Sequence, residues 1–101
     1  MADRITTKDL DALLARIQRE TGRPALEWTP REDGCGHKCD IGALFVVPGS
    51  PTYGRAWALC TTMDRSGVHR VVLRARTAAA LHAAMEAYLA GWADAKREAA
   101  P

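Results

Sequence analysis

The sequence lacks any apolar run that approaches the ~18 residues a membrane-spanning helix needs. It also lacks the phosphate-binding motifs G-x-x-x-x-G-K-[ST] and G-x-G-x-x-G, so nothing indicates a nucleotide site. The opening MADRITTKDL carries charges where a secretory segment would place its apolar core. We therefore expect a cytoplasmic protein with no membrane partner and no small-molecule substrate.

Neither sign of charge dominates the chain. Lys and Arg total 14 against 12 Asp and Glu, and a net charge of +2 is too small to indicate a nucleic-acid partner by itself. Apolar residues make up 48% of the 101 residues, which excludes a disordered chain and suffices for one small core without disulfides. The skew toward eleven Arg and nineteen Ala is typical of GC-rich coding.

The clearest predicted element is a helix over residues 7–21. Thr6 is placed to cap its first turn, and Asp9 lies at its third position, where a carboxylate also interacts favourably with the helix dipole. Gly22 and Pro24 then end the helix. Its apolar residues form one stripe: Leu10, Leu13, Leu14 and Ile17.

Short strands separated by turn residues are predicted to follow. They cover residues 25–29, 41–47, 56–63 and 68–74. The breaker-rich segment 30–40 is predicted to form a turn or a hairpin tip, and the tetrapeptide DRSG a hairpin turn. In the last strand Val71 and Leu73 alternate with more exposed positions, which indicates one face on the helices and one partly in water.

A closing helix begins after Thr77, a natural N-cap. Its large side chains repeat at helical spacing: Leu81, Met85, Tyr88, Leu89 and Trp92. The order α-β-β-β-β-α predicts an α+β fold, in which an antiparallel sheet of three or four strands carries the N-terminal and C-terminal helices on one face. We expect one domain over residues 4–95 and a frayed tail over 96–101.

Three stretches of the chain together resemble small proteins encoded by actinobacteriophages: RITTKDLDALLARIQRETGRP, PTYGRAWALCTT and GVHRVV…LHAAMEAYLAGW. Those proteins open with an RIT-x-x-DL helix ending in TG-x-P, carry a YGG-like turn before a Trp or Tyr strand, and finish with a helix. This chain departs from them in its CGHKC insert and in Arg55, which follows Gly54 where a second Gly is expected. The resemblance implies a phage origin and this fold, and it brings no assigned activity.

Cys35, His37 and Cys39 form the one cluster with metal-ligand chemistry. Their C-x-H-x-C spacing differs from the C-x₂-C pairing of zinc knuckles. A fourth ligand would have to be Cys60, His69 or His82. A disulfide between Cys35 and Cys39 would be reduced in a cytosol. We therefore expect a polar hairpin tip with two exposed thiols, and neither a metal nor a cofactor.

Catalysis needs a nucleophile that an adjacent base activates. Cys60 with His69 is the one pair that a hairpin would bring together, and no glycine turn that would hold an oxyanion lies nearby. We expect that the protein is not an enzyme and has no catalytic residue.

Trp57 is the leading candidate for a binding residue, because Trp is enriched at the centres of protein interfaces. If Trp57, Leu59 and Thr61 point outward, they form an apolar patch beside Arg70 and Arg74. We hypothesise a small non-enzymatic phage accessory protein that binds a host protein, or a second copy of itself, in the host cytoplasm.

The alternative is a nucleic-acid-binding module, because the αβββα order resembles the topology of double-stranded-RNA-binding domains. Its phosphate contacts would come from four arginines: Arg55, Arg70, Arg74 and Arg76. Against this alternative, the closing helix begins TAAALHAA and lacks the lysine cluster of those domains.

Overall fold

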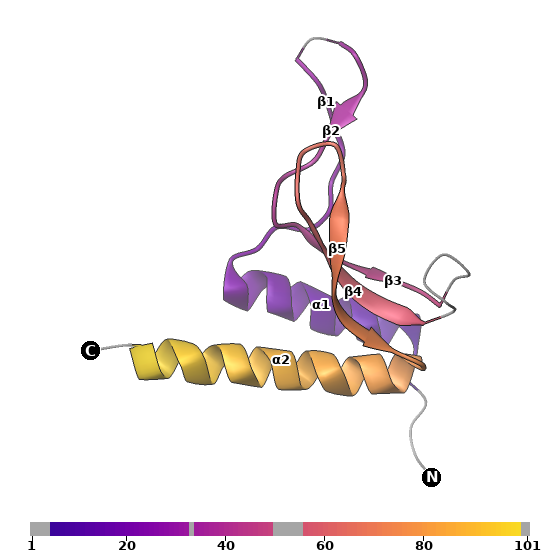
Figure 1. The fold of residues 1–101 in the computed structure, drawn as a ribbon. Helices are drawn as coiled ribbons and strands as arrows, with labels where there is room; N and C mark the ends of the chain where they lie inside the picture. The colour runs from indigo at the N-terminus through magenta and orange to yellow at the C-terminus, as the bar shows by residue number, and fades with distance from the viewer. Residues whose placement is uncertain (1–4, 33, 50–55, 100–101) are drawn as a thin grey trace.

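The computed structural model describes residues 5–32, 34–49 and 56–99, which form an α+β fold with a helix at each end of the chain (Figure 1). The elements are α1 (Thr7–Thr21), β1 (Thr29–Pro30), β2 (His37–Lys38), β3 (Leu44–Val47), β4 (Trp57–Thr62), β5 (His69–Ala75) and α2 (Ala78–Ala99). All strand pairs are antiparallel and belong to two sheets, one of order β3-β4-β5 and one made of β1 and β2 alone. The predicted fold class is confirmed.

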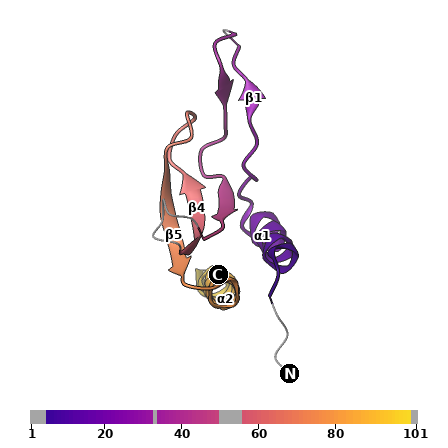
Figure 2. The same ribbon diagram turned by 90° about the vertical axis from the view of Figure 1, so that its right-hand side faces the viewer.

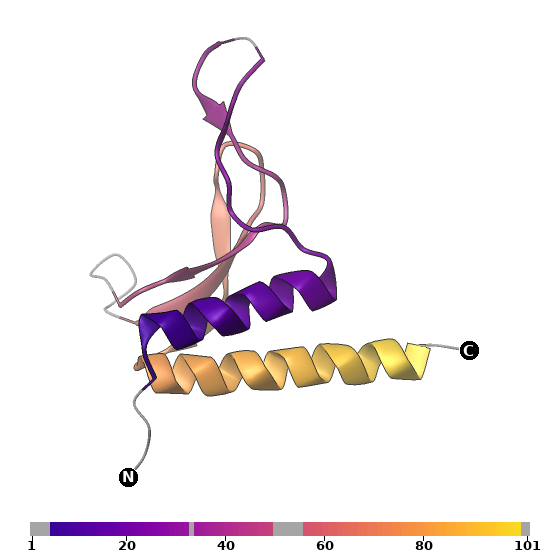
Figure 3. The ribbon, with the colours of Figure 1, turned by 180° about the vertical axis from the view of Figure 1, so that it is seen from behind.

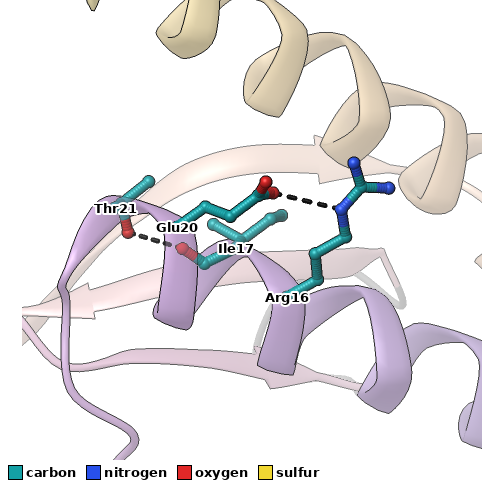
Figure 4. A network of polar contacts seen from close by, with 4 residues as sticks. All are labelled: Arg16, Ile17, Glu20 and Thr21. Carbon is teal, nitrogen blue, oxygen red and sulfur yellow. Dashed lines mark hydrogen bonds and ion pairs between the residues drawn. The ribbon is translucent and has the colours of Figure 1, made fainter.

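Helix α1 begins and ends where its sequence predicts. Thr6 and Asp9 form a reciprocal capping box, in which the Thr6 N–H donates to the Asp9 carboxylate at 2.9 Å and the Thr6 hydroxyl accepts from the Asp9 N–H at 3.3 Å. Gly22 closes the helix with a positive φ of 73°. Near that end, the Thr21 hydroxyl donates to the Ile17 carbonyl oxygen at 2.6 Å (Figure 4).

The core lies between the two helices and one face of the three-stranded sheet. Figure 3 shows α1 and α2 side by side, running in the same direction beneath the strands. The buried cluster takes residues from α1, β3, β4 and α2: Leu10, Leu13, Ile17, Leu44, Leu59, Leu81, Met85 and Leu89. Burying these side chains drives the helices onto the sheet.

A bulge in β5 changes the face on which several side chains lie. Leu59 pairs with Leu73, but Cys60 pairs with Val71, so Val72 is an extra residue. Leu73 and Val72 pack against the core, whereas Val71 shares the opposite face of the sheet with Cys60. The predicted alternation, which placed Val71 and Leu73 on one face, is therefore wrong.

The β1–β2 hairpin projects away from the helical layer (Figures 1 and 2). We call residues 28–32 and 34–39 the arm. The predicted strand over 25–29 is wrong, since Ala25 makes only one bridge, to Leu44, and β1 begins at Thr29. The segment 30–40, predicted as a turn or hairpin tip, contains strand β2, which pairs antiparallel with β1.

Helix α2 extends to Ala99, so residues 96–99 are helical where the sequence predicts a frayed tail. Thr77 caps its start as expected, accepting a hydrogen bond from the Ala80 N–H at 3.0 Å. Within the part of the chain that the structure describes, neither helix combines the length and apolar character that a membrane crossing demands.

Candidate interaction site

Trp57 does not point outward. It is half-buried at the start of β4 and packs against the core together with Leu59. Thr61, also on this face, accepts a hydrogen bond from Arg23 Nη2 at 2.9 Å. The condition for an exposed Trp57–Leu59–Thr61 patch is therefore not met, because the helices cover this side of β4.

The predicted arginines do not form one group. Arg55 lies outside the described residues. Arg70 pairs with Thr61, whose side faces the helices, whereas Arg74 pairs with Ala58 on the opposite face. Arg76 lies after β5 and lines a groove of about 670 Å³ with Trp57. Arg70, Arg74 and Arg76 are all exposed.

The Trp57–Arg76 groove lies at the starts of both helices, with walls from Thr6, Thr77 and their neighbours. Helix starts attract anions when their N–H groups are unsatisfied. Here the Thr6 and Thr77 hydroxyls already accept from the Asp9 and Ala80 N–H groups. Hydrogen bonds from Thr6 also hold the pKa of the Asp9 carboxyl below its ordinary value, which keeps a negative charge close by. This groove therefore does not favour phosphate.

The two cysteines of the predicted tip have different environments. Cys35 is exposed on the arm, but Cys39 is buried, with Sγ 3.6 Å from the Asp64 carbonyl oxygen and 3.5 Å from that of Arg65. The expectation of two exposed thiols is thus wrong, because Cys39 packs under the β4–β5 turn. Among the described residues, no three His, Cys, Asp or Glu side chains converge as metal ligands.

Cys60 and His69 do not pair directly across β4 and β5, because Cys60 lies opposite Val71 and His69 opposite Thr62. Cys60 is buried opposite Val71, and this burial raises the pKa of its thiol against a smaller opposing effect of Arg74. The His69 ring packs edge-on against Phe45, with centroids 5.2 Å apart, and its Nδ1 lies 3.2 Å from the Gly67 carbonyl oxygen. A raised thiol pKa lowers the thiolate fraction that nucleophilic attack requires.

Exposed apolar side chains gather instead where the arm meets the β4–β5 turn. Trp28 precedes β1, Ile41 follows the arm, and Met63 and Val68 face each other across the turn, joined by a Met63 N–H to Val68 carbonyl hydrogen bond. Their exposed fractions are 49%, 60%, 51% and 58%, respectively. We call these four residues the arm junction. In the sequence, the one indication of the arm junction is Trp28, which lies in the segment 25–29 predicted as a strand.

Two contacts fix the arm to the β4–β5 turn, and hydrogen bonds within the turn hold it closed. The Trp28 indole lies against Gly67. The Cys39 N–H donates to the Arg65 carbonyl oxygen at 3.0 Å. The turn is closed by the Asp64 carboxylate, which accepts from the Ser66 N–H at 2.9 Å, the Ser66 hydroxyl at 2.7 Å and the Val68 N–H at 3.1 Å. The arm junction is therefore a formed surface.

A shallow basic pocket adjoins the arm junction. It has a volume of about 280 Å³ and is lined by Arg31, Glu32, Lys38 and Arg65. Lys38 Nζ lies 3.7 Å from a Glu32 carboxylate oxygen, and the Glu32 side chain is almost fully exposed. The lining carries three cations against one carboxylate, so its local charge is positive.

The chain matches no protein-family model, no curated protein and no solved structure. Its likeness to small phage proteins rests on the sequence patterns alone.

Proposed function

We propose that the chain is a small, non-enzymatic phage accessory protein that acts by binding a host protein through the arm junction. The observation that carries this proposal is the gathering of four exposed apolar side chains at that junction: Trp28, Ile41, Met63 and Val68. Single exposed apolar residues are ordinary on protein surfaces, whereas several on neighbouring segments are typical of a surface that contacts another molecule.

The composition of the arm junction suits a protein partner. Trp28 is the residue type most enriched at interface hot spots, and Met63 adapts its shape to different surfaces. The junction is also fixed by the Trp28–Gly67 contact before any partner arrives. A surface that is already ordered loses less conformational entropy on binding.

The environments of Cys60 and His69, the candidate nucleophile and base, favour binding over catalysis. Burial raises the pKa of the Cys60 thiol, and the His69 ring packs against Phe45. Among the described residues, no group of three His, Cys, Asp or Glu side chains could hold a metal ion.

The experiment is capture of tagged protein from a nuclease-treated actinobacterial lysate. The test variant carries Met63→Gln and Val68→Thr, which remove apolar surface at exposed positions and leave the core intact. The control carries Ala12→Gln and Ala87→Gln, on exposed positions of the two helices. We expect a discrete host protein to be retained by the wild type and the control and lost by the test variant. Equal retention by all three proteins would refute the proposal.

A second candidate function, nucleic-acid binding, is favoured by one observation. Between Asp64 and Glu86 the chain carries no acidic residue and four arginines: Arg65, Arg70, Arg74 and Arg76. Phosphate contacts release counterions, so this function predicts a strong loss of affinity with added salt. Capture that disappears after nuclease treatment would favour it over protein binding.

A further inference from the structure

We infer that the partner of the arm junction is a protein segment that carries acidic side chains beside apolar ones. This inference rests on the proposed function and adds the chemistry of the partner. It follows from the basic pocket, which places Arg31, Lys38 and Arg65 next to the exposed apolar residues of the junction.

The charged and apolar groups are neighbours in the fold as well as along the chain. Arg65 belongs to the same β4–β5 turn as Met63 and Val68, and its carbonyl oxygen accepts from the Cys39 N–H. Lys38 pairs with Thr29, the residue after Trp28. A partner segment that lies along the β4–β5 turn therefore comes close both to the exposed apolar side chains and to Arg65.

Arg65 is the cation most available to a partner. Its side chain is exposed and makes no ion pair within the described part of the chain. Its backbone is held by Cys39 and by the Asp64 hydrogen bonds that close the turn. A guanidinium on such a fixed turn is suited to a bidentate contact with a carboxylate.

The pocket favours carboxylates on a protein over the phosphates of a nucleic acid. Glu32 lines the same pocket and repels a continuous phosphate backbone, whereas a peptide can place its few carboxylates away from Glu32. Trp28 is the one aromatic side chain of the arm junction, whereas Ile41, Met63 and Val68 have no ring on which the successive bases of a single strand could stack. Charge complementarity and side-chain type thus point to the same partner.

The test uses three fluorescein-labelled probes: a peptide that alternates Glu and Leu, a peptide with Lys in place of Glu, and a thymidine decanucleotide. Binding to the full chain is followed by fluorescence anisotropy at about 50 and 200 mM salt. We expect the Glu–Leu peptide to bind best and to bind more weakly at the higher salt concentration. Equal binding of the Lys–Leu peptide, or tighter binding of the oligonucleotide, would overturn the inference.

Arg65→Glu is the test variant, with Lys8→Glu as a control that makes the same charge change in the first turn of α1, remote from the arm. We expect Arg65→Glu to weaken Glu–Leu peptide binding about tenfold or more and Lys8→Glu to leave it nearly unchanged. Arg65→Lys should weaken binding less than Arg65→Glu does, because the ammonium keeps the positive charge but loses the bidentate geometry. An Arg65→Glu affinity equal to that of the wild type would overturn the inference. If Met63→Gln with Val68→Thr still abolishes host-protein capture in that case, the proposed function stands and only the acidic chemistry fails.

Discussion

The indole of Trp28 lies so close to Gly67 that a Cβ atom at residue 67 would be 2.6 Å from the ring carbon Cη2. Gly67 also has a φ of +99°, a conformation that side-chain-bearing residues rarely adopt. This contact helps to join the arm to the β4–β5 turn, beside the hydrogen bond from the Cys39 N–H to the Arg65 carbonyl oxygen, and it requires the absence of a side chain at residue 67.

Gly67→Ala is therefore expected to lower the free energy of unfolding more than Gly34→Ala does. Gly34 has a comparable φ of +76°, but open space surrounds its Cβ direction. Each variant bears the backbone strain, and Gly67→Ala alone displaces Trp28, which adds about 1–3 kcal/mol. Urea unfolding followed by tryptophan fluorescence measures both effects. An equal loss in the two variants would show that the Trp28 contact contributes nothing.

Arg23 is expected to contribute to stability without a carboxylate partner. Its guanidinium donates to the Gly42 carbonyl oxygen at 3.2 Å, to the Tyr88 hydroxyl at 3.5 Å and to the Thr61 hydroxyl at 2.9 Å. These bonds connect four separate segments in a half-buried site. Arg23→Met should lower the free energy of unfolding by about 1–3 kcal/mol.

The control for that measurement is Arg19→Met, an exposed position in the last turn of α1, where a change within about 0.5 kcal/mol is expected. If both variants lowered the free energy of unfolding by similar amounts, the hydrogen bonds of Arg23 would contribute no more to stability than hydrogen bonds to water do.

Asp64 is expected to make stability depend on acid pH. The hydrogen bond from the Ser66 hydroxyl, followed by those from backbone N–H groups, holds the pKa of the Asp64 carboxyl below its ordinary value. A lowered folded-state pKa gives stability that is present above the unfolded-state pKa of about 3.9 and is lost as the pH falls through the folded-state value.

The measurement for Asp64 is the urea midpoint of the wild type and Asp64→Asn between pH 7 and pH 2. The difference between them should be constant above about pH 5 and shrink toward zero as the carboxyl is protonated. A difference that persists at the lowest pH would assign the effect to side-chain shape and not to charge.

The three cysteines are expected to react unequally with a thiol reagent. Cys35 is exposed, whereas Cys39 and Cys60 are buried, and burial raises the pKa of the Cys60 thiol. The folded protein should therefore release about one equivalent of thionitrobenzoate rapidly and the other two only in denaturant. Cys35→Ser should abolish the fast phase, and a fast phase that survives this change would contradict the placement of Cys39.

The sequence was sufficient for the elements whose signals are local. Thr6, Asp9 and Gly22 determine the ends of α1 through contacts within a few residues, and these ends were predicted correctly. Strands β3, β4 and β5 were also found to within a few residues, because β-rich runs and turns alternate there. Their faces were harder to predict, because the bulge at Val72 depends on pairing with a distant strand.

The sequence patterns do not reveal the candidate interaction site, because its residues come from separate segments of the chain. Trp28 and Gly67 are thirty-nine positions apart, and neither signals the other. The sequence favours Trp57 as a binding residue because Trp is enriched at interfaces. Residue type does not show which face of β4 the helices cover, and Trp57 lies on the covered face. Cys39 was expected in solvent because its neighbours are polar, whereas the turn that buries it lies at Asp64 and Arg65.

The bridge between Ala25 and Leu44 joins the two ends of the segment that contains the arm, so this segment forms a closed loop. Among the described residues, the buried cluster shared by the helices and the sheet has no member from positions 18–43, and the buried Cys39 and Ala43 lie outside that cluster. An insertion in the arm lengthens this loop, and the entropic cost of closing a loop rises only slowly with its length. The Ala25–Leu44 bridge thus marks where the chain leaves the layer of helices and sheet for the arm and where it returns, so a change of arm length is expected to leave the packing of the two helices on β3–β5 intact.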